Sequence, residues 1–587
     1  MALSVIAEIS QDEKTLILIA DGHDYEVAHA AREIAQITPK AKASNPKGAL
    51  VVPVSFAAVV QLNAIFGTRL KKQPRLQAWM ARQVMLRVPS VEPALEAIPP
   101  AGLEPRQYQV EGAALFASTG RALFFDEPGT GKTITSILGV VERSLVADVL
   151  PVLVVCPASV VDNWVNEFRK WAPHWWATAW RGSKSRRENL IGTSHVYVVS
   201  YDTCRNDASS ADPRDGNPLI ALRARTVIAD ECHRIKSHQS QQSKAVRRLA
   251  EKAEHFIGLS GTPITHHPGD LWPTLAALEP VAWPSRERWV NRYCSTIPGD
   301  YDQKILGLHP ATEPEFRTIL TGQHRRVAKA DVLTQLPPKV YSVRYVELPP
   351  AYRKAYDEME KTMLAELPDG EELSVMTVLA QLTRLSQLAC AAADVDVELV
   401  VDPNTLEESV HQKVTLKAPS WKVDALLEIL AERPGQPVVT CAPSRQLMML
   451  AGERATAEGY RVGYVVGGQK PAERTQMIED FQAGKLDLIC VTTQAGGVGI
   501  TLTAASTIVF LQRPWSLVDA LQMEDRIHRI GSEIHDSVEV IDVVASNTID
   551  TRVRSVLKGK AGQLADLLND QRIVEEILGG INKKKAA

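Results

Sequence analysis

Several features that mark particular classes of protein are missing from this chain of 587 residues. Its seven cysteines are dispersed and form no Cys-x-x-Cys pair, so the sequence favours neither a disulfide framework nor a zinc ribbon. No internal repeat at solenoid spacing and no low-complexity tract is found. With 45% apolar residues, the chain has enough hydrophobic material for sizeable cores, and its length predicts about three or four domains.

Long hydrophobic runs and targeting signals are also missing. The first residues lack a basic region and Glu8 interrupts their apolar stretch, so no signal peptide is expected. The most apolar stretch, 495–511, is rich in Gly and Thr and shorter than a membrane span. We therefore expect no membrane association, and we expect reduced thiols and a monomeric protein. The expected location is the cytoplasm, either associated with a nucleoid or in a host cell, or the nucleus if the source is a eukaryote.

Strong net charge is the third absence, because the formal charge is only −3. Any prediction of nucleic-acid binding must therefore rest on local charge. Between Glu33 and Glu92 there is no acidic residue, while nine basic residues intervene. These are Lys40, Lys42, Lys47, Arg69, Lys71, Lys72, Arg75, Arg82 and Arg87. We expect Arg69, Lys71, Lys72 and Arg75 to contact DNA phosphates beside Phe66 and Trp79; the alternative is a solvated basic face.

Among the features that are present, a phosphate-binding loop follows the apolar run 122–125. In the segment 126–133, Gly129 and Gly131 permit a tight backbone whose N–H groups face phosphate oxygens, and Thr130 between them is also expected to bind ATP. Lys132 would reach the terminal phosphates, and Thr133 would offer its hydroxyl to Mg²⁺. The segment departs from the usual pattern because Asp126 stands where the first glycine is expected.

A second short apolar strand, 226–229, ends in Asp230 and Glu231. Open parallel sheets bind ligands at the carboxyl ends of their strands, so Asp230 is expected to hold Mg²⁺ and Glu231 to orient an attacking water. The alternative is an acidic pair that caps the next helix.

Near the end of the chain, Gln522, Asp525, Arg526 and Arg529 are spaced i, i+3, i+4 and i+7. This spacing predicts that they share one face of a helix. Two guanidinium groups there suit a triphosphate held by another domain, because guanidinium recognises phosphate in a planar, bidentate way. A solvated, salt-bridged helix face is the alternative interpretation.

The order of the motifs resembles that of superfamily-two helicases, and their form resembles the Swi/Snf-like double-stranded DNA translocases over residues 103–560. The resemblance is carried by Gln109, the loop 126–133, Cys156-Pro157, Ser200-Tyr201, 230–233, 259–263, Gly467-Gly468, 492–499, Trp515 and 525–532. The family's arginine motif reads Asp-Arg-x-His-Arg-x-Gly-Gln, and here Ser532 replaces the final glutamine.

The resemblance implies an α/β fold with two RecA-like parallel-sheet lobes, helical insertions, and ATP with Mg²⁺ between the lobes. It implies that Gln109 lies near the adenine, that Gly499 contacts ATP, and that Arg526 and Arg529 are arginine fingers. The DNA contacts that it implies are Ser159, Ser200, Thr493 and Trp515.

Five segments are expected: a small α+β domain at 1–95, a first lobe at 96–345, a helical protrusion and linker at 346–418, a second lobe at 419–570 and a tail at 571–587. Within the first of them, strands are expected at 15–19 and 49–53. A helix is expected at 351–367 and a loop at 390–418. The N-terminal domain is weakly similar to the HARP-type domain of annealing helicases, over about 60 residues.

The expected function is an ATP-dependent translocase on double-stranded or forked DNA that remodels DNA structures or DNA-bound proteins in replication, repair or recombination. Single-strand-binding or replication proteins are expected partners. Two alternatives stay open, namely a helicase that remodels RNA or single strands, and an ATP-switched clamp that hydrolyses slowly.

Overall fold

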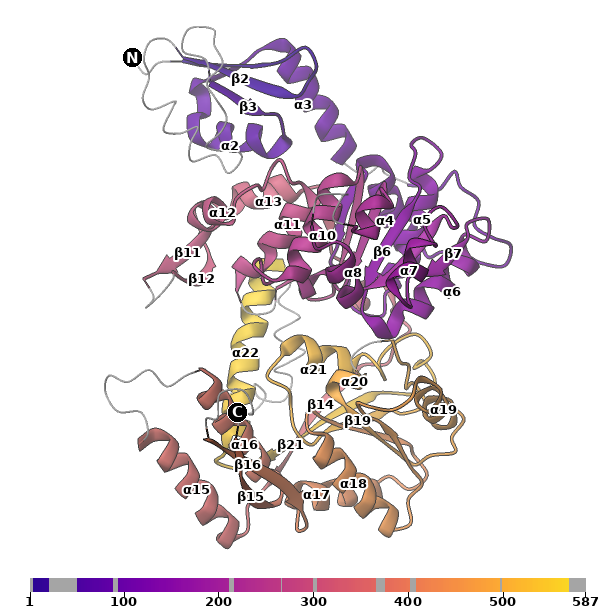
Figure 1. Ribbon diagram of the computed structural model, residues 1–587, viewed down its shortest axis with the longest axis vertical. Helices are drawn as coiled ribbons and strands as arrows, with labels where there is room; N and C mark the ends of the chain where they lie inside the picture. The colour runs from indigo at the N-terminus through magenta and orange to yellow at the C-terminus, as the bar shows by residue number, and fades with distance from the viewer. Residues whose placement is uncertain are drawn as a thin grey trace. The chain divides into compact units, whose positions relative to one another are not determined.

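The computed structural model describes residues 4–20, 50–87, 93–210, 216–264, 267–298, 303–365, 375–401, 408–496 and 499–568. The chain forms two compact units, Met1–Val332 and Leu333–Ala587 (Figure 1). Lys40, Lys42 and Lys47, residues 497–498 and the tail from 571 lie outside the described residues.

The N-terminal module of the first unit is α+β, as expected. Its four-stranded sheet has the order β3-β2-β1-β4, with β1 antiparallel to β2 and parallel to β4. The elements are β1 (Val5–Ile9), β2 (Thr15–Ala20), β3 (Leu50–Pro53), α2 (Phe56–Phe66), β4 (Leu70–Lys72) and α3 (Pro74–Arg87). Apolar residues that alternate along β1 and β2 pack against α2 and α3, which makes a small separate core.

The first lobe is a seven-stranded sheet with the order β13-β5-β10-β9-β6-β8-β7, in which every pairing is parallel. Its strands are β5 (Arg121–Phe124), β6 (Val152–Cys156), β7 (Ala177–Ala179), β8 (Val196–Ser200), β9 (Thr226–Asp230), β10 (His255–Leu259) and β13 (His324–Arg325). Residues of β6, β8, β9 and β10 are almost all buried, as expected of strands covered on both faces.

Helices connect these strands by crossovers (Figure 1). They are α5 (Lys132–Arg143), α6 (Val161–Trp171), α7 (Lys184–Glu188), α8 (Tyr201–Asp207), α9 (Pro218–Ala221) and α10 (Gln241–Lys252), while α4 (Gln107–Thr119) precedes β5 and α11 (Trp272–Leu278) follows β10. The crossovers through α5 and α6 run along the sheet in one direction, and those through α8 and α10 run in the other. Because such crossovers are right-handed, the two groups cover opposite faces.

An insertion follows α11. It contains α12 (Arg286–Tyr293), the hairpin of β11 (Cys294–Ile297) and β12 (Lys304–Leu308), and α13 (Glu313–Leu320). The short helix α14 (Lys329–Val332) ends the first unit.

The second lobe is a six-stranded parallel sheet with the order β14-β21-β20-β17-β19-β18. Its strands are β14 (Lys339–Val346), β17 (Val438–Ala442), β18 (Val462–Val465), β19 (Leu488–Thr492), β20 (Thr507–Phe510) and β21 (Val538–Ala545). Its helices are α15 (Pro350–Ala365), α16 (Val375–Leu388), α17 (Trp421–Ala431), α18 (Arg445–Ala457), α19 (Pro471–Gln482), α20 (Thr493–Gly496), α21 (Leu517–Glu524) and α22 (Ile549–Leu568).

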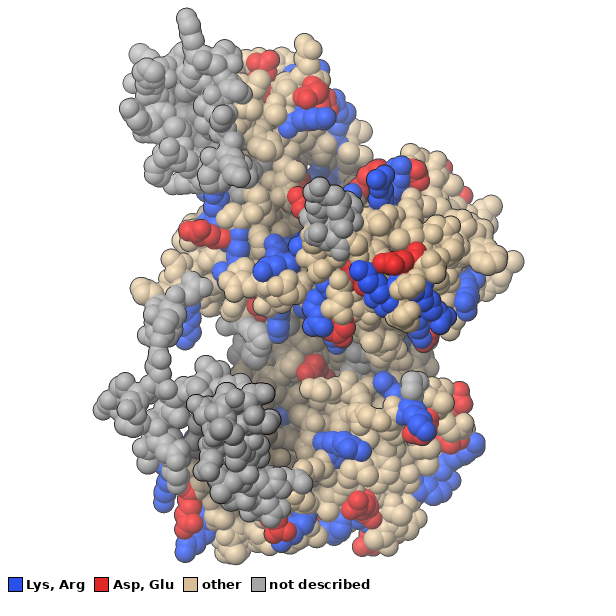
Figure 2. Space-filling view, in the orientation of Figure 1, with Lys and Arg blue, Asp and Glu red and all other residues tan. Residues whose placement is uncertain are grey.

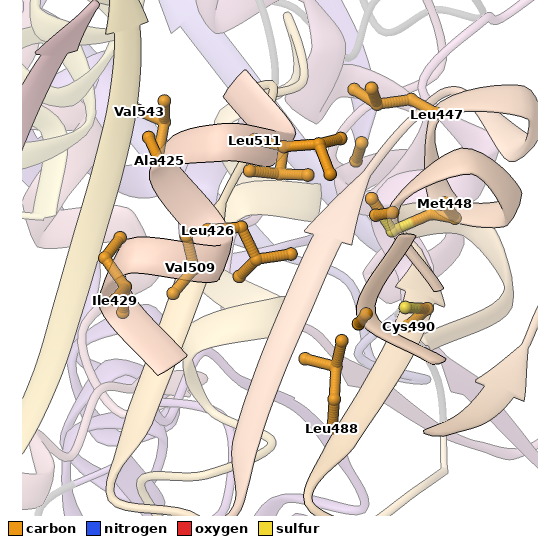
Figure 3. Close-up of a cluster of buried hydrophobic side chains, with 14 of the residues drawn as sticks. Ala425, Leu426, Ile429, Leu447, Met448, Leu488, Cys490, Val509, Leu511 and Val543 are labelled. Atoms are coloured by element: carbon orange, nitrogen blue, oxygen red, sulfur yellow. The ribbon is translucent and has the colours of Figure 1, made fainter. Parts of the chain in front are cut away.

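The core on one face of this sheet is drawn in Figure 3. Leu426 and Ile429 of α17 and Met448 of α18 pack against Cys490 of β19 and Val509 of β20, all with no exposed surface. Each such large apolar side chain contributes about 1.5–3 kcal/mol relative to an exposed one.

Two expectations about the middle of the chain differ from the structure. Residues 390–418 are not a loop, because β15 (Ala392–Val401) pairs with β16 (Glu408–Lys417) in an antiparallel hairpin. The alternation of Asp and Val over 394–397 is the period-two signal of a strand. In addition, β14 begins at Lys339, before the expected boundary at 345, and it pairs with β21 of the second sheet.

On the face shown in Figure 2, basic and acidic side chains are interspersed over the described parts of the chain. This agrees with the small net charge. All seven cysteines are buried free thiols. None of the described helices is long and apolar enough to cross a bilayer.

Candidate nucleotide-binding site and arginine turn

The loop that is predicted to bind phosphate connects β5 to α5, so the expected order of strand, loop and helix is present. Gly129 and Gly131 have φ values of 86° and 82°, which residues with a side chain rarely adopt. A Cβ at Gly131 would also lie 2.5 Å from the Gln109 amide nitrogen. The Lys132 ammonium donates to the carbonyl oxygens of Asp126 at 2.6 Å and Glu127 at 3.1 Å. The loop therefore holds a cation beside the N-terminus of a helix, where an anion is favoured.

Helix α4 is tied to this loop at its first turn. The Tyr108 hydroxyl donates to the Thr130 carbonyl at 2.9 Å, and the Gln109 amide donates to the same oxygen at 3.3 Å. The Gln109 side-chain oxygen accepts from the Arg106 N–H at 3.0 Å. Gln109 is thus buried against the loop, and its contact with adenine stays a prediction.

The register of the sheet places Asp230 level with the phosphate loop. Leu259 of β10 pairs with Phe124, the last residue of β5, on one side and with Asp230 of β9 on the other. The Trp164 indole donates to the Asp230 carboxylate at 2.8 Å. The carboxyl end of β9 thus points its acid to the end of the sheet where the loop begins.

Burial raises the pKa of Asp230 to about 6, and the charge of Glu231 adds to this rise. The Trp164 hydrogen bond and the positive charge of Lys132 oppose it. A bound divalent cation would favour the ionised form in the same way as Lys132.

Glu231 has a left-handed backbone, with φ of 53°, which is uncommon for a residue with a side chain. Its carboxylate lies 3.2 Å from Nδ1 of His233, and that nitrogen lies 3.0 Å from the Ser260 hydroxyl. The Glu231 side chain makes no capping hydrogen bond to the short helix that follows, so helix capping does not explain this residue. Strained backbone of this kind clusters at functional sites.

The donors that are present fit Mg²⁺ bound with a nucleotide. Thr133 lies in the first turn of α5 and is half-buried, and Asp230 offers a carboxylate oxygen. Mg²⁺ prefers one or two such oxygen ligands and takes the rest from phosphates and water.

We expected the arginine segment of the second lobe to be helical throughout, but only its first part is. Helix α21 ends at Glu524, and residues 525–531 form turns. The Arg526 carbonyl accepts from the Leu502 N–H at 2.9 Å, so it is not available to continue the helix. The single helical face predicted for Gln522, Asp525, Arg526 and Arg529 was therefore wrong.

The turn nevertheless brings the two arginines together. Arg526 and Arg529 donate to the same carbonyl, that of Ile500, at 3.3 and 3.1 Å. Gln522, Asp525 and Arg526 are buried, so the segment is not a solvated, salt-bridged surface. Burial lowers the pKa of Arg529, and the charge of Asp525 opposes the shift. We call residues 525–531 the arginine turn.

Sequence reasoning missed the ion-pair network that supports this turn. Arg513 donates to Glu524 at 2.8 Å and to Asp542 at 2.6 Å. Lys339 and Tyr341 of β14 also reach Glu524, at 3.5 and 2.9 Å. These residues come from three separate stretches of sequence, so no local pattern signals their contact.

The remaining expected DNA contacts lie in different environments. Ser159 is exposed, and Trp515 is 38% exposed. Ser200 caps α8 by accepting from the Thr203 N–H at 3.3 Å, and Thr493 is buried at the start of α20. Gly499 has a φ of 76°. None of these roles is tested by the geometry, and each stays a prediction.

In the N-terminal module, Lys71 is exposed. Lys72 donates to Asn63 at 3.0 Å, Arg75 donates to the Gln11 carbonyl at 3.0 Å, and the Arg69 guanidinium lies 5.8 Å from the Phe66 ring centre. These four residues lie on the short segment 69–75.

Other residues of the segment between Glu33 and Glu92, both aromatic and basic, do not fit a DNA-binding face. Phe66 and Trp79 are buried in the core of the module, so the expectation that they lie among the phosphate contacts was wrong. Arg87 is buried 4.3 Å from the Phe56 ring centre, and Arg82 pairs with Glu13 at 2.5 Å.

Comparison with known protein families gives two matches. The SNF2-related domain matches residues 76–393, and the helicase conserved C-terminal domain matches residues 421–531. The loop, Asp230 and Ser260 fall in the first match, and the arginine turn falls in the second.

Similar curated proteins include the TATA-binding protein-associated factor MOT1 of Saccharomyces cerevisiae, 25% identical over 79% of this chain and 27% of MOT1. The ISWI chromatin-remodeling complex ATPase ISW1 of the same yeast is 27% identical over 82% of this chain and 41% of ISW1. The mouse DNA annealing helicase and endonuclease ZRANB3 is 26% identical over 77% of this chain and 40% of ZRANB3. This chain thus spans less than half the length of these relatives.

Among solved structures, the Sulfolobus solfataricus SWI2/SNF2 ATPase core in complex with double-stranded DNA is similar at 21% identity and a TM-score of 0.36. The alignment covers 81% of this chain and 97% of that one.

Proposed function

Since this chain belongs to the SNF2-related family of helicase-like ATPases, we propose that it hydrolyses ATP to move along double-stranded DNA and to remodel DNA structures or DNA-bound proteins. The observation that carries the proposal is the common register of the phosphate loop and Asp230 at one end of the first sheet. A nucleotide at this end would meet Lys132, Thr133 and Asp230 together.

Each residue then has a role in hydrolysis. Lys132 binds the terminal phosphates, while Thr133 and Asp230 hold Mg²⁺, which neutralises charge on the phosphates. Glu231 orients the attacking water. Arg526 and Arg529 stabilise the charge that develops on the transferred phosphoryl group when the second lobe closes on the nucleotide.

Double-stranded DNA is the proposed substrate because the similar proteins are named for chromatin remodelling and DNA annealing. Forks and joints in replication, repair or recombination are the proposed targets. The small N-terminal module would contact the DNA through Arg69, Lys71, Lys72 and Arg75.

The test is the rate of ATP hydrolysis with no nucleic acid, duplex DNA, forked DNA, single-stranded DNA and RNA. We expect duplex or forked DNA to stimulate hydrolysis most. Displacement of a third strand from a triplex then shows movement along the duplex. Stimulation by RNA alone would contradict the proposal, and ATP-dependent DNA binding with very slow hydrolysis would identify a clamp instead.

A further inference from the structure

The phosphate loop of this chain carries two acidic side chains at the place where it must accept an anion. Asp126 and Glu127 lie between the end of β5 and Gly129. Their negative charges would repel a triphosphate and would compete with it for Lys132. Among the described residues, Lys132 donates to the backbone carbonyls of these two residues alone, at 2.6 and 3.1 Å. Something must therefore hold the carboxylates away from the lysine.

Arg325 pairs with the first acid. Its Nη2 and Nε donate to Oδ2 of Asp126 at 2.7 and 3.2 Å. The Asp126 side chain is 1% exposed and that of Arg325 is 13% exposed. The second carboxylate oxygen, Oδ1, is buried and has no hydrogen-bond partner among the described residues. The charge of Asp126 is thus balanced mainly by one guanidinium.

Arg326, the next residue, pairs with the second acid. Its Nη2 lies 3.3 Å from Oε1 of Glu127, and its Nη1 donates to the Phe125 carbonyl at 3.1 Å. The other oxygen of Glu127 accepts from the Lys329 N–H at 2.8 Å. Both acids are therefore held by the segment 325–329.

The pairing of β13 with β5 and the glycine at position 112 make these contacts possible. Strand β13 is an edge strand that pairs with β5, and Arg325 pairs in register with Phe124, immediately before the loop. The guanidinium of Arg325 passes next to α4 at Gly112, where a Cβ would lie 2.6 Å from its Cζ atom. Any larger residue at 112 would displace the guanidinium.

We propose that Arg325 and Arg326 are positioning residues for the nucleotide, because they neutralise the acidic pair of the loop and leave the Lys132 ammonium available to phosphate. This inference rests on the proposed function, since it assumes that the loop binds ATP. It also explains how Asp126 can replace the glycine expected at the first position of the loop.

The test is equilibrium binding of ATP, ADP and AMP to the full chain without DNA. Arg325→Gln should weaken ATP binding by about tenfold or more, because the loop that receives the phosphates then carries an uncompensated buried carboxylate. The loss should decrease from ATP to ADP to AMP. Asp126→Asn added to Arg325→Gln should restore most of the affinity. Equal losses for all three nucleotides, or no recovery in the double variant, would overturn the proposal.

Arg187→Gln is the matched control. Arg187 forms a similarly buried, bidentate pair with Asp207 in the same lobe, at 2.6 and 2.7 Å. This variant should lose stability but keep its ATP affinity. It therefore distinguishes an effect of lost stability on ATP binding from an effect of uncompensated charge in the loop. If Arg325→Gln does not fold, Arg326→Gln with and without Glu127→Gln gives the same comparison at a pair that is less deeply buried.

The failure of this role differs from that of the proposed function. A wild-type chain that binds no ATP overturns both. A wild-type chain that binds ATP, with an Arg325→Gln variant of unchanged affinity, overturns only the role of the arginines.

Discussion

Two single residues of the first lobe have different expected roles, because Lys132 is expected to bind phosphate and Glu231 is expected to orient water. Lys132 brings a full positive charge to the loop and donates to the backbone carbonyls of Asp126 and Glu127. Glu231 lies beyond the end of a strand, in a strained conformation beside His233 and Ser260. Loss of the first should prevent binding of the triphosphate, whereas loss of the second should prevent its hydrolysis.

Lys132→Ala should abolish ATP turnover without unfolding the chain, because its ammonium is only half-buried at the helix start. The measurement is steady-state hydrolysis with duplex DNA, together with the melting temperature. Lys252→Ala, at the exposed end of α10, is the control. Stimulated hydrolysis in the Lys132 variant would mean that another loop binds ATP.

Glu231→Gln should bind ATP but not turn it over, since Asp230 would still hold Mg²⁺ and the amide keeps the shape of the carboxylate. A nucleotide titration and a turnover assay on the same preparation check this. A large loss of nucleotide affinity would argue that Glu231 binds the nucleotide rather than orienting water.

Among the elements, the arginine turn is held by contacts on several sides. Leu502 binds the Arg526 carbonyl, and Ile500 accepts from both guanidinium groups. Glu524, at the end of α21, is fixed by Arg513 and by two residues of β14. A turn that is held in this way can keep the buried Arg526 and the half-buried Arg529 together without a helix.

Arg529→Ala should therefore remove most DNA-stimulated turnover and change ATP binding little. The loss of an arginine finger is worth roughly 10³-fold or more in turnover in related chemistry. Arg461→Ala is the control, because Arg461 forms an exposed pair with Asp487 in the same lobe. Nearly normal stimulated rates in the Arg529 variant would contradict the finger role.

Two strands of the first sheet carry histidines, the buried His255 on β10 and the half-buried His324 on β13. Burial is the main cause that lowers the pKa of both below the usual value of 6.5, and nearby arginines add to the effect. The unfolded chain therefore binds more protons than the folded chain as the pH falls through 6.5. Stability from these groups is present above that pH and is lost below it.

The free energy of unfolding in urea should thus decrease between pH 7.5 and pH 5.5. Replacing both histidines with Asn should reduce this pH dependence, even if the double variant is less stable at neutral pH. An unchanged dependence in the double variant would show that other groups cause it.

Within the first unit, the N-terminal module contacts the lobe through buried hydrogen bonds and through close packing. Gln61 of α2 donates to the Tyr293 hydroxyl at 2.7 Å, and that hydroxyl donates to Glu315. Arg87 lies against Gly322, where an added Cβ would meet it at 2.2 Å. Deletion of residues 1–95 would expose these buried groups, so substitutions test the role of the module more cleanly.

Replacing Arg69, Lys71, Lys72 and Arg75 with Gln should weaken DNA binding and flatten its salt dependence. Each lost phosphate contact removes roughly 0.9 from the slope of log affinity against log salt on B-form DNA. Hydrolysis without DNA should stay unchanged. Binding to forked and linear duplex over a salt series is the measurement, and an unchanged slope would mean that these residues do not contact DNA.

The sequence alone predicted the features that depend on local backbone and composition. The turn with two glycines between β5 and α5, the strand that ends at Asp230 and the parallel sheets are confirmed, because glycines at positive φ and apolar strands act over a few residues. The helix expected at 351–367 is present as α15. Hydrolysis, DNA contacts and the fingers stay predictions.

Tertiary structure decided what depends on partners distant in sequence. The Arg526 carbonyl, beyond the end of α21, accepts from Leu502 rather than from a helical neighbour. Phe66 and Trp79 pack in one core with apolar residues of the N-terminal strands. Asp126 meets Arg325, 199 residues away, only because β13 pairs with β5. A local sequence pattern carries no information on which strands become neighbours, so these contacts could not be read from it.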